Sequence, residues 1–189
     1  MRISDLLEDP DILDEITRPR LMNHAEEILL AAGYEKAGHG LYANVFIRPG
    51  ENSVLKLFNA EDQAYIDFYN LVRNSNDIHF PKFKGRLMKI TEWYYAARME
   101  KLEPLPPTMY GFNTAIIMAR LDDLLKDRRL NAQEERMLQF MREVQPGFIE
   151  ACEYLAKTLG ENHYLDLHAG NVMLRGDTMV VTDPVSPKG

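Results

Sequence analysis

The sequence predicts an α+β fold in which a sheet-rich part precedes a helical part. Short extended runs dominate residues 34–102, and helical periodicity dominates residues 110–159. Between them, the proline-rich stretch 103–107 interrupts regular structure, because proline fixes φ and lacks an N–H donor. Strands followed by helices are typical of α+β domains. We therefore expect a single domain, 1–189, with a first lobe of about 1–101, a hinge of about 100–107 and a second lobe of about 108–189.

Turn residues and apolar spacing place the elements of the first lobe. Gly33 follows an apolar stripe at helical spacing and marks a helix end, and Pro49-Gly50 marks the turn of a β-hairpin. The expected elements are a helix at 20–32, strands at 42–47 and 53–58, a helix at 60–74, and extended runs at 83–90 and 92–102.

The second lobe is expected to be helical and short. Helical spacing predicts helices at 110–127, 132–143 and 147–159, the last ending at Gly160. The tail from 164 to 185 predicts a loop and two short strands around a Gly-Asp turn. Because only six residues follow Asp183, we expect a truncated second lobe.

Composition excludes several classes of function. The net charge of −7 argues against nucleic acid as a partner, because such binding depends on basic residues that neutralise phosphates. No apolar run approaches the roughly 20 residues that span a bilayer, and the first ten residues lack a signal-peptide pattern. We expect a cytoplasmic protein without a membrane segment. Cys152, the single cysteine, lies in an apolar helical stretch and is expected to be buried.

The run from Asp166 to Asn171, D-L-H-A-G-N, and the later Asp183 carry the strongest chemical signal. Phosphoryl transfer from ATP needs one carboxylate to orient and deprotonate the attacking hydroxyl, and oxygen ligands to hold Mg²⁺. This pattern predicts Asp166 as the catalytic residue and Asn171 with Asp183 as the metal ligands. Residues of these types also cap turns and end strands, and the pattern alone leaves that alternative open.

His168 lies inside this loop and has two possible roles. It can donate to the γ-phosphate as negative charge develops there. It can also form a hydrogen bond that shapes the loop. The sequence does not decide between them.

A glycine-bearing segment upstream predicts phosphate contacts. It reads G-x-G-x-Y-A-x-V and contains Gly38, Gly40, Ala43 and Val45. Glycines let the backbone N–H groups approach phosphate oxygens closely. Lys56 follows on the next strand, where alternation turns its side chain away from Leu55 and Leu57 and toward the α/β-phosphates. A plain turn and a solvent-facing lysine are the alternatives.

Two further groups complete the expected nucleotide site. Glu61 or Asp62 is expected to lie on the following helix and to orient Lys56, with Glu61 favoured because it continues the apolar stripe. The backbone of Glu100 to Leu102 is expected to contact the adenine edge, with Met99 behind the pocket. An edge strand without a ligand remains the alternative for this run.

These four features occur in the order that one ATP cleft requires, and the chain resembles the protein-kinase-like superfamily. D-L-H-A-G-N is similar to the catalytic loop of aminoglycoside and choline kinases. A closer resemblance is to the early serine/threonine protein kinase of short-tailed bacteriophages, over roughly residues 34–186, including T-D-P-V-S at 182–186. It implies a minimal bilobed kinase-like fold, with an antiparallel sheet and one helix in the first lobe and a truncated helical second lobe.

The resemblance also implies ATP and Mg²⁺ as cofactors, autophosphorylation, and Ser/Thr phosphorylation of bacterial host proteins, among them transcription or defence proteins. Tyr164 stands where many kinases have the histidine of H-R-D, and Pro184-Val185 replaces Phe-Gly. Two alternatives remain: a small-molecule kinase, and a pseudokinase that binds and inhibits a host protein. The oligomeric state is not predicted.

Overall fold

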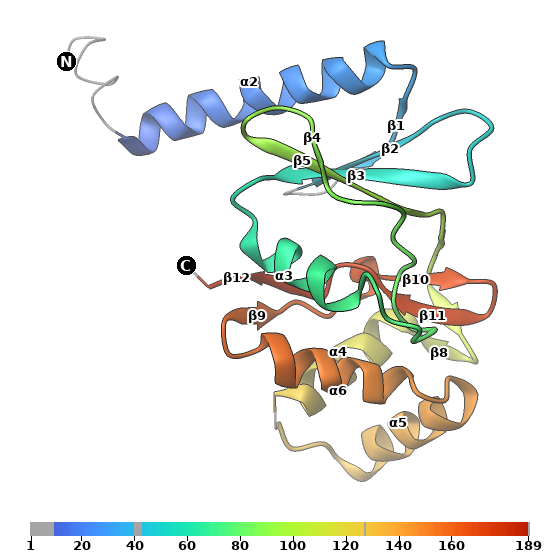
Figure 1. Cartoon of the computed structure of the whole chain (residues 1–189). Helices are drawn as coiled ribbons and strands as arrows, with labels where there is room; N and C mark the ends of the chain where they lie inside the picture. Colours follow the sequence, from blue (N-terminus) through green and yellow to red (C-terminus); the bar gives the residue numbers. More distant parts are fainter. Residues whose placement is uncertain (1–9, 40–42, 127, 189) are drawn as a thin grey trace. The chain divides into compact units, whose positions relative to one another are not determined.

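A computed structural model of the chain describes residues 10–39, 43–126 and 128–188 (Figure 1). Its internal contacts divide the chain into two compact units. The first, which we call the sheet unit, comprises Met1–Glu61 and Lys84–Met99. The second, the helical unit, comprises Asp62–Phe83 and Glu100–Gly189.

The sheet unit is a five-stranded sheet with one long helix on it. Its elements are α2 (Pro10–Ala31), β1 (Glu35–His39), β2 (Ala43–Ile47), β3 (Ser53–Asn59), β4 (Met88–Lys89) and β5 (Tyr94–Glu100). The strand order is β1-β2-β3-β5-β4. The β1–β2, β2–β3 and β4–β5 pairs are antiparallel.

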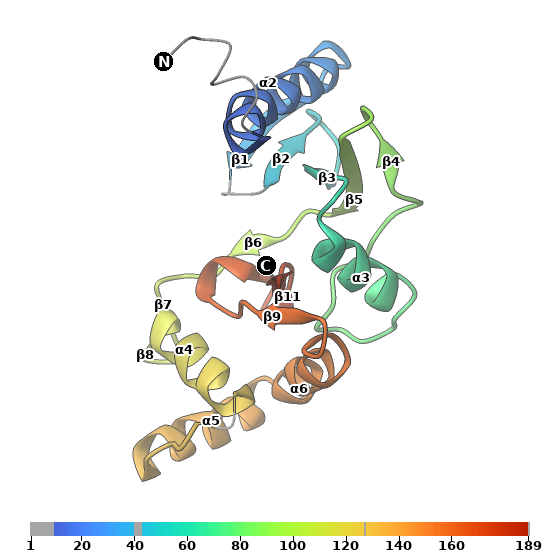
Figure 2. The same ribbon diagram turned by 90° about the vertical axis from the view of Figure 1, so that its left-hand side faces the viewer.

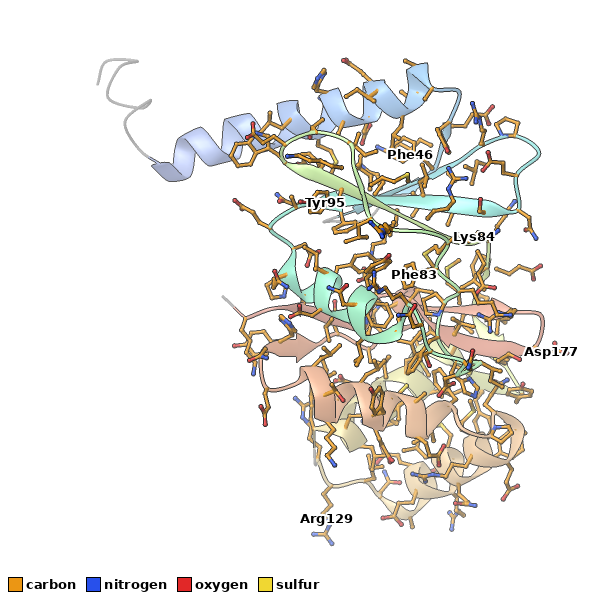
Figure 3. The ribbon with its side chains drawn as sticks, viewed as in Figure 1. Phe46, Phe83, Lys84, Tyr95, Arg129 and Asp177 are labelled. Carbon is orange, nitrogen blue, oxygen red and sulfur yellow. The ribbon has the colours of Figure 1, made fainter. Side chains whose placement is uncertain are left out.

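Helix α2 covers one face of this sheet, and the core of the unit lies between them. Phe46 is fully buried there, below α2 in Figure 3. The core cluster consists of Ala25, Leu29, Phe46, Leu55, Leu57, Tyr94 and Ala96. Burying such apolar side chains contributes about 1.5–3 kcal/mol each. This contribution fixes which residues of β2, β3 and β5 face the helix.

The helical unit combines four helices with three small antiparallel sheets (Figures 1 and 2). Its helices are α3 (Gln63–Val72), α4 (Thr114–Leu125), α5 (Ala132–Val144), α6 (Phe148–Leu159) and the short 3₁₀ turn η1 (Ala169–Asn171). Its strands are β6 (Glu103–Pro104), β7 (Thr108–Met109), β8 (Phe112–Asn113), β9 (His163–Leu165), β10 (Val172–Arg175), β11 (Thr178–Val181) and β12 (Val185–Pro187). The sheets have the orders β11-β10-β6, β12-β9 and β7-β8.

Polar side chains set where the helices of this unit begin. Asn131 and Glu134 form a capping box at the start of α5, so each side chain accepts a backbone N–H that the helix leaves unpaired. Asn113 caps α4 in the same manner. Gly147 precedes α6 with φ of 92°, a conformation that favours glycine, and a Cβ there would meet His79 Nε2 at 3.3 Å.

The α+β class and the helices expected at 132–143 and 147–159 are confirmed. Cys152 is buried in α6 as predicted, and burial raises the pKa of its thiol well above the ordinary range. Among the described residues, every helix is too short or too polar to cross a bilayer.

Several predicted limits differ from the structure. The first helix extends back to Pro10, and the helix expected at 110–127 begins only at Thr114, because the β7–β8 hairpin occupies the preceding residues. The run expected to be extended over 83–90 forms a strand only at Met88–Lys89. The spacing of apolar residues does not reveal hairpins this short, because a two-residue strand is defined by the strand with which it pairs.

Residues 62–83 fall within the expected first lobe of about 1–101, but the structure groups them with other residues. They belong to the helical unit, because α3 packs on β12 and α6. The face that α3 buries consists of Ala64, Tyr65, Phe68, Tyr69 and Val72. The apolar stripe was predicted, but a stripe does not specify which partner covers it.

Arg175 joins three segments of the helical unit. Its guanidinium donates to Ile78 O at 2.6 Å and Phe80 O at 2.9 Å, and it forms a bidentate pair with the Glu100 carboxylate. The Lys82 N–H donates to the same carboxylate at 2.7 Å. Burial alone raises the pKa of Glu100, but the hydrogen bonds from Arg175 and Lys82 outweigh it and lower the pKa below its ordinary value.

The variant Glu100→Gln should therefore have a free energy of unfolding that depends less on pH in the acidic range. Because the folded-state pKa is depressed, the carboxylate stabilises the fold above its unfolded-state pKa, and this stabilisation is lost as the pH falls through the folded-state pKa. At neutral pH we expect a loss of about 1–3 kcal/mol. Thermal melts between neutral pH and about pH 3 should show the difference between variant and wild type shrinking toward acid.

Glu103→Gln is the matched control, because Glu103 is an exposed carboxylate on the neighbouring strand β6. A Glu100→Gln curve parallel to wild type at every pH would contradict the assignment.

Candidate functional site

The pairing of β9 with β12 brings two of the predicted residues to one place. Leu165 pairs with Val185, and the Asp166 N–H donates to Pro184 O at 2.8 Å. Asp166 directly follows β9, and Asp183 stands two residues before β12. The two carboxylates therefore lie at the same end of this two-stranded sheet.

Asn171 is tied to the neighbourhood of both aspartates. Its side-chain Nδ2 donates to Asp166 O at 2.6 Å. Its carbonyl oxygen accepts the Thr182 N–H at 2.8 Å and the Thr182 hydroxyl at 3.0 Å. Since Nδ2 is used by Asp166, the amide has Oδ1 to offer a cation. The structure thus brings Asp166, Asn171 and Asp183 together by main-chain contacts.

His168 shapes the loop between them. Its Nδ1 accepts the Gly170 N–H at 3.0 Å, so the neutral ring carries its hydrogen on Nε2, which lies 3.8 Å from Asp166 Oδ1. A Cβ at Gly170 would meet the ring at 2.9 Å, so a larger residue there would displace the His168 side chain. The loop-shaping hydrogen bond is present. A role in donating to phosphate stays a prediction.

Tyr65 of α3 is a neighbour of Asp183 that the motif did not reveal. Its ring is fully buried, and burial followed by the negative charge of Asp183 raises the pKa of its hydroxyl well above the ordinary value. The phenol is therefore neutral beside that carboxylate. The packing of α3 on β12 brings Tyr65 near Asp183.

Lys56 occupies the sheet face opposite α2, within the sheet unit. Leu55 and Leu57 point into the core under α2, and Lys56 alternates with them, with only 8% of its surface exposed. Val45 is its cross-strand partner on β2. Two of the predicted nucleotide contacts therefore share one face. The same face carries the buried Phe58, which meets Tyr95 edge to face.

The glycine segment is described in part. Gly38 lies in β1 at an irregularity of the β1–β2 pairing, and Ala43 begins β2. The prediction for Gly40 falls outside the described residues.

The prediction that Glu61 or Asp62 lies on the helix after β3 is wrong, because that helix begins only at Gln63. Glu61 precedes the helix, is exposed, and donates its N–H to Asn59 Oδ1 at 2.8 Å. Asp62 is the N-cap of α3, and its carboxylate accepts the Tyr65 N–H at 3.0 Å. Capping outweighs helical phase here, because a first-turn N–H needs an acceptor. An interaction of either with Lys56 stays a prediction.

The predicted adenine contacts lie at the end of β5. Met99 is 5% exposed, and Leu102 is also buried. The Glu100 N–H donates to Lys82 O at 3.0 Å, so this N–H already has a partner within the protein. The contact of Glu100 and Leu102 with adenine stays a prediction.

Asn171 and Asp183 fit a magnesium ion. Both supply hard oxygen donors, which Mg²⁺ prefers, and Mg²⁺ is usually held by one or two carboxylates together with water and substrate phosphates. Within the described ranges, no group of three or more His, Cys, Asp or Glu side chains is arranged to hold a metal.

Replacing His168 should test its loop contact. His168→Ala removes the acceptor of the Gly170 N–H, and we expect hydrogen exchange of that amide to accelerate about fivefold, since one hydrogen bond contributes about 1 kcal/mol. His168→Asn retains an acceptor at the Nδ1 position and should exchange nearly as wild type. Unchanged exchange in the alanine variant would contradict the assignment.

Comparisons with known proteins give likenesses among solved structures. No protein-family model and no curated protein match the chain. The crystal structure of Rad53 1–466 in complex with AMP-PNP matches with a TM-score of 0.47 and 15% sequence identity. The match covers 82% of this chain and 38% of the Rad53 chain, so this chain spans well under half of that protein.

Proposed function

We propose that the chain is an ATP- and Mg²⁺-dependent phosphotransferase. The observation that carries the proposal is the set of hydrogen bonds that links Asp166, Asn171 and the neighbours of Asp183 in the helical unit. Asp166 is bonded to Pro184 beside Asp183, and Asn171 is bonded to both Asp166 and Thr182. This arrangement supplies one exposed carboxylate for an acceptor and two oxygen donors for a metal, as phosphoryl transfer requires.

Each residue has a distinct role in the proposed reaction. Asp166 orients the acceptor hydroxyl and takes its proton while the hydroxyl oxygen bonds to the γ-phosphorus and ADP leaves. Asn171 Oδ1 and the Asp183 carboxylate hold Mg²⁺, which neutralises the phosphate charge when bound. Lys56, with only 8% of its surface exposed, is proposed to contact the α/β-phosphates through its ammonium group.

The finer assignment is serine/threonine phosphorylation of bacterial host proteins and of the chain itself. It is supported by the resemblance of residues 166–171 and 182–186 to the phage kinases. Transfer to small hydroxylated metabolites, or binding of a host protein without transfer, would replace this assignment. Incubation of radiolabelled ATP with bacterial lysate, with a metabolite panel and with the protein alone separates the three.

Replacing Asp166 tests the catalytic role. We expect Asp166→Asn to lower the rate of transfer by about 10²–10⁴-fold, because the lost carboxylate acts mainly in the transition state. The affinity for Mg-ATP should stay within about threefold, because Asp166 is not assigned to bind nucleotide. Radiolabel transfer and calorimetric titration with ATP measure the two quantities.

Asp177→Asn is the matched control, since Asp177 is an exposed carboxylate at the β10–β11 turn. It should transfer as wild type does, and EDTA should abolish transfer in both. Undiminished transfer by Asp166→Asn would refute the catalytic assignment.

Replacing Lys56 tests whether the sheet unit contributes to nucleotide binding. Lys56→Met preserves much of the apolar stem but removes the charge, and we expect Mg-ATP to bind at least tenfold more weakly, since a charged hydrogen bond contributes about 1.5–3 kcal/mol. Lys89→Met, on the exposed end of β4, should bind ATP normally. Equal affinity in the two variants would exclude Lys56 from the site.

A further inference from the structure

Asp67 and His163 form a contact that the sequence did not suggest. His163 begins β9 and is 6% exposed, and its Nε2 lies 2.8 Å from Asp67 Oδ2 on helix α3. The other carboxylate oxygen, Oδ1, accepts the Gln63 side-chain amide at 2.5 Å. Two donors therefore hold the Asp67 carboxylate in one orientation. Asp67 is not among the buried residues of α3.

This contact lies close to Asp166 along the chain. His163 precedes Asp166 by three residues of extended chain, about 10 Å. Between them, β9 pairs with β12, through Pro187 at one end and Val185 at the other. A displacement of His163 is thus passed directly to the Asp166 loop.

Helix α3 supports both strands of this pair. It packs on β12, and Tyr65 of the same helix lies close enough to Asp183 to sense its charge. The contact from Asp67 to His163 adds β9 to the same support. Without it, β9 would depend on β12 and on its contact with α6 alone.

A buried histidine needs a hydrogen-bond partner wherever it lies, and this need is the simplest explanation of the contact between Asp67 and His163. His79 illustrates it, because its two ring nitrogens face the carbonyls of Met179 and Pro146. The partner of His163 is of a different kind, because it is a side chain on a separate helix. Gln63 in turn holds the Asp67 carboxylate in place. Such a contact couples the positions of two elements, and a coupling of this kind has consequences that can be measured.

We propose that Asp67 and His163 are positioning residues that hold β9, and through it the Asp166 loop, in register with helix α3. The inference rests on the proposed phosphotransferase function for its kinetic consequence. Its structural consequence, a fixed Asp166 backbone, does not need that function.

Kinetics of full-length variants test the proposal. Asp67→Ala and His163→Leu should lower kcat for transfer by about 10–100-fold, because a displacement of about 1 Å costs up to about 10²-fold. KM for ATP should stay within about twofold, since neither residue is assigned to bind nucleotide. Asp67→Asn keeps an acceptor oxygen for the His163 Nε2–H and should recover most of kcat.

Hydrogen exchange of the Asp166 amide gives a readout that does not depend on activity. This amide donates to Pro184 O, and we expect its exchange to accelerate at least about tenfold in Asp67→Ala and His163→Leu but not in Asp67→Asn. The Val181 amide, which donates to His79 O, should keep its wild-type rate and so exclude global unfolding. Gln63→Ala is a milder variant at an exposed position and should accelerate Asp166 exchange by a smaller factor.

Gln145→Leu is the matched control for lost stability. Its amide is buried and bonds Tyr110, Asp177 and Met179 away from β9, so it should lower Tm without lowering kcat or accelerating Asp166 exchange. Variants of Asp67 and His163 that behave like this control would overturn the proposal, as would faster exchange with unchanged kcat. Absence of transfer in the wild type would refute the proposed function, and exchange at Asp166 would then decide the positioning role alone.

Discussion

The hydrogen-bonded pairing of β9 with β12 is the constraint on which the candidate site depends. Asp166 and Asp183 are separated by sixteen intervening residues, yet the bond from the Asp166 N–H to Pro184 O sets them side by side. The chain between them folds back as η1 and the β10–β11 hairpin, and Asn171 closes this loop through its bonds to Asp166 and Thr182. Hydrogen bonds accepted by backbone carbonyls therefore hold the three residues of the candidate site in place.

Polar contacts connect the segment before β5 to the rest of the helical unit. Arg175 on β10 binds the carbonyls of Ile78 and Phe80 and the Glu100 carboxylate. His79 bonds Met179 O and Pro146 O at 2.8 and 2.9 Å. A buried polar group without its partner is unfavourable by about 1–3 kcal/mol, so the bonds of the buried His79 select one path for an otherwise irregular segment, and the bonds of Arg175 hold the same segment. The position of Glu100 at the end of β5 follows from that path.

In the sheet unit, alternation along β3 separates structural from functional side chains. Leu55 and Leu57 anchor the sheet to α2, and Lys56 between them is turned to the other face beside Val45. This assignment was predictable because a period of two residues is fixed by strand geometry alone. The position of the carboxylates after β3 was not predictable in this way. Asp62 caps α3 because a helix start needs an acceptor, a demand that competes with helical phase.

The sequence by itself determined the α+β class, the helices of the second half, the phase of Lys56 and the residue types of the Asp166–Asp183 loop. These properties follow from local periodicity, turn residues and the chemistry of individual side chains. Tertiary structure alone decided that α3 packs on β12, that Tyr65 neighbours Asp183, and that Asp67 meets His163. Such contacts join residues about a hundred positions apart. No local pattern specifies them, because an apolar stripe or a lone carboxylate is compatible with many partners until the chain has folded.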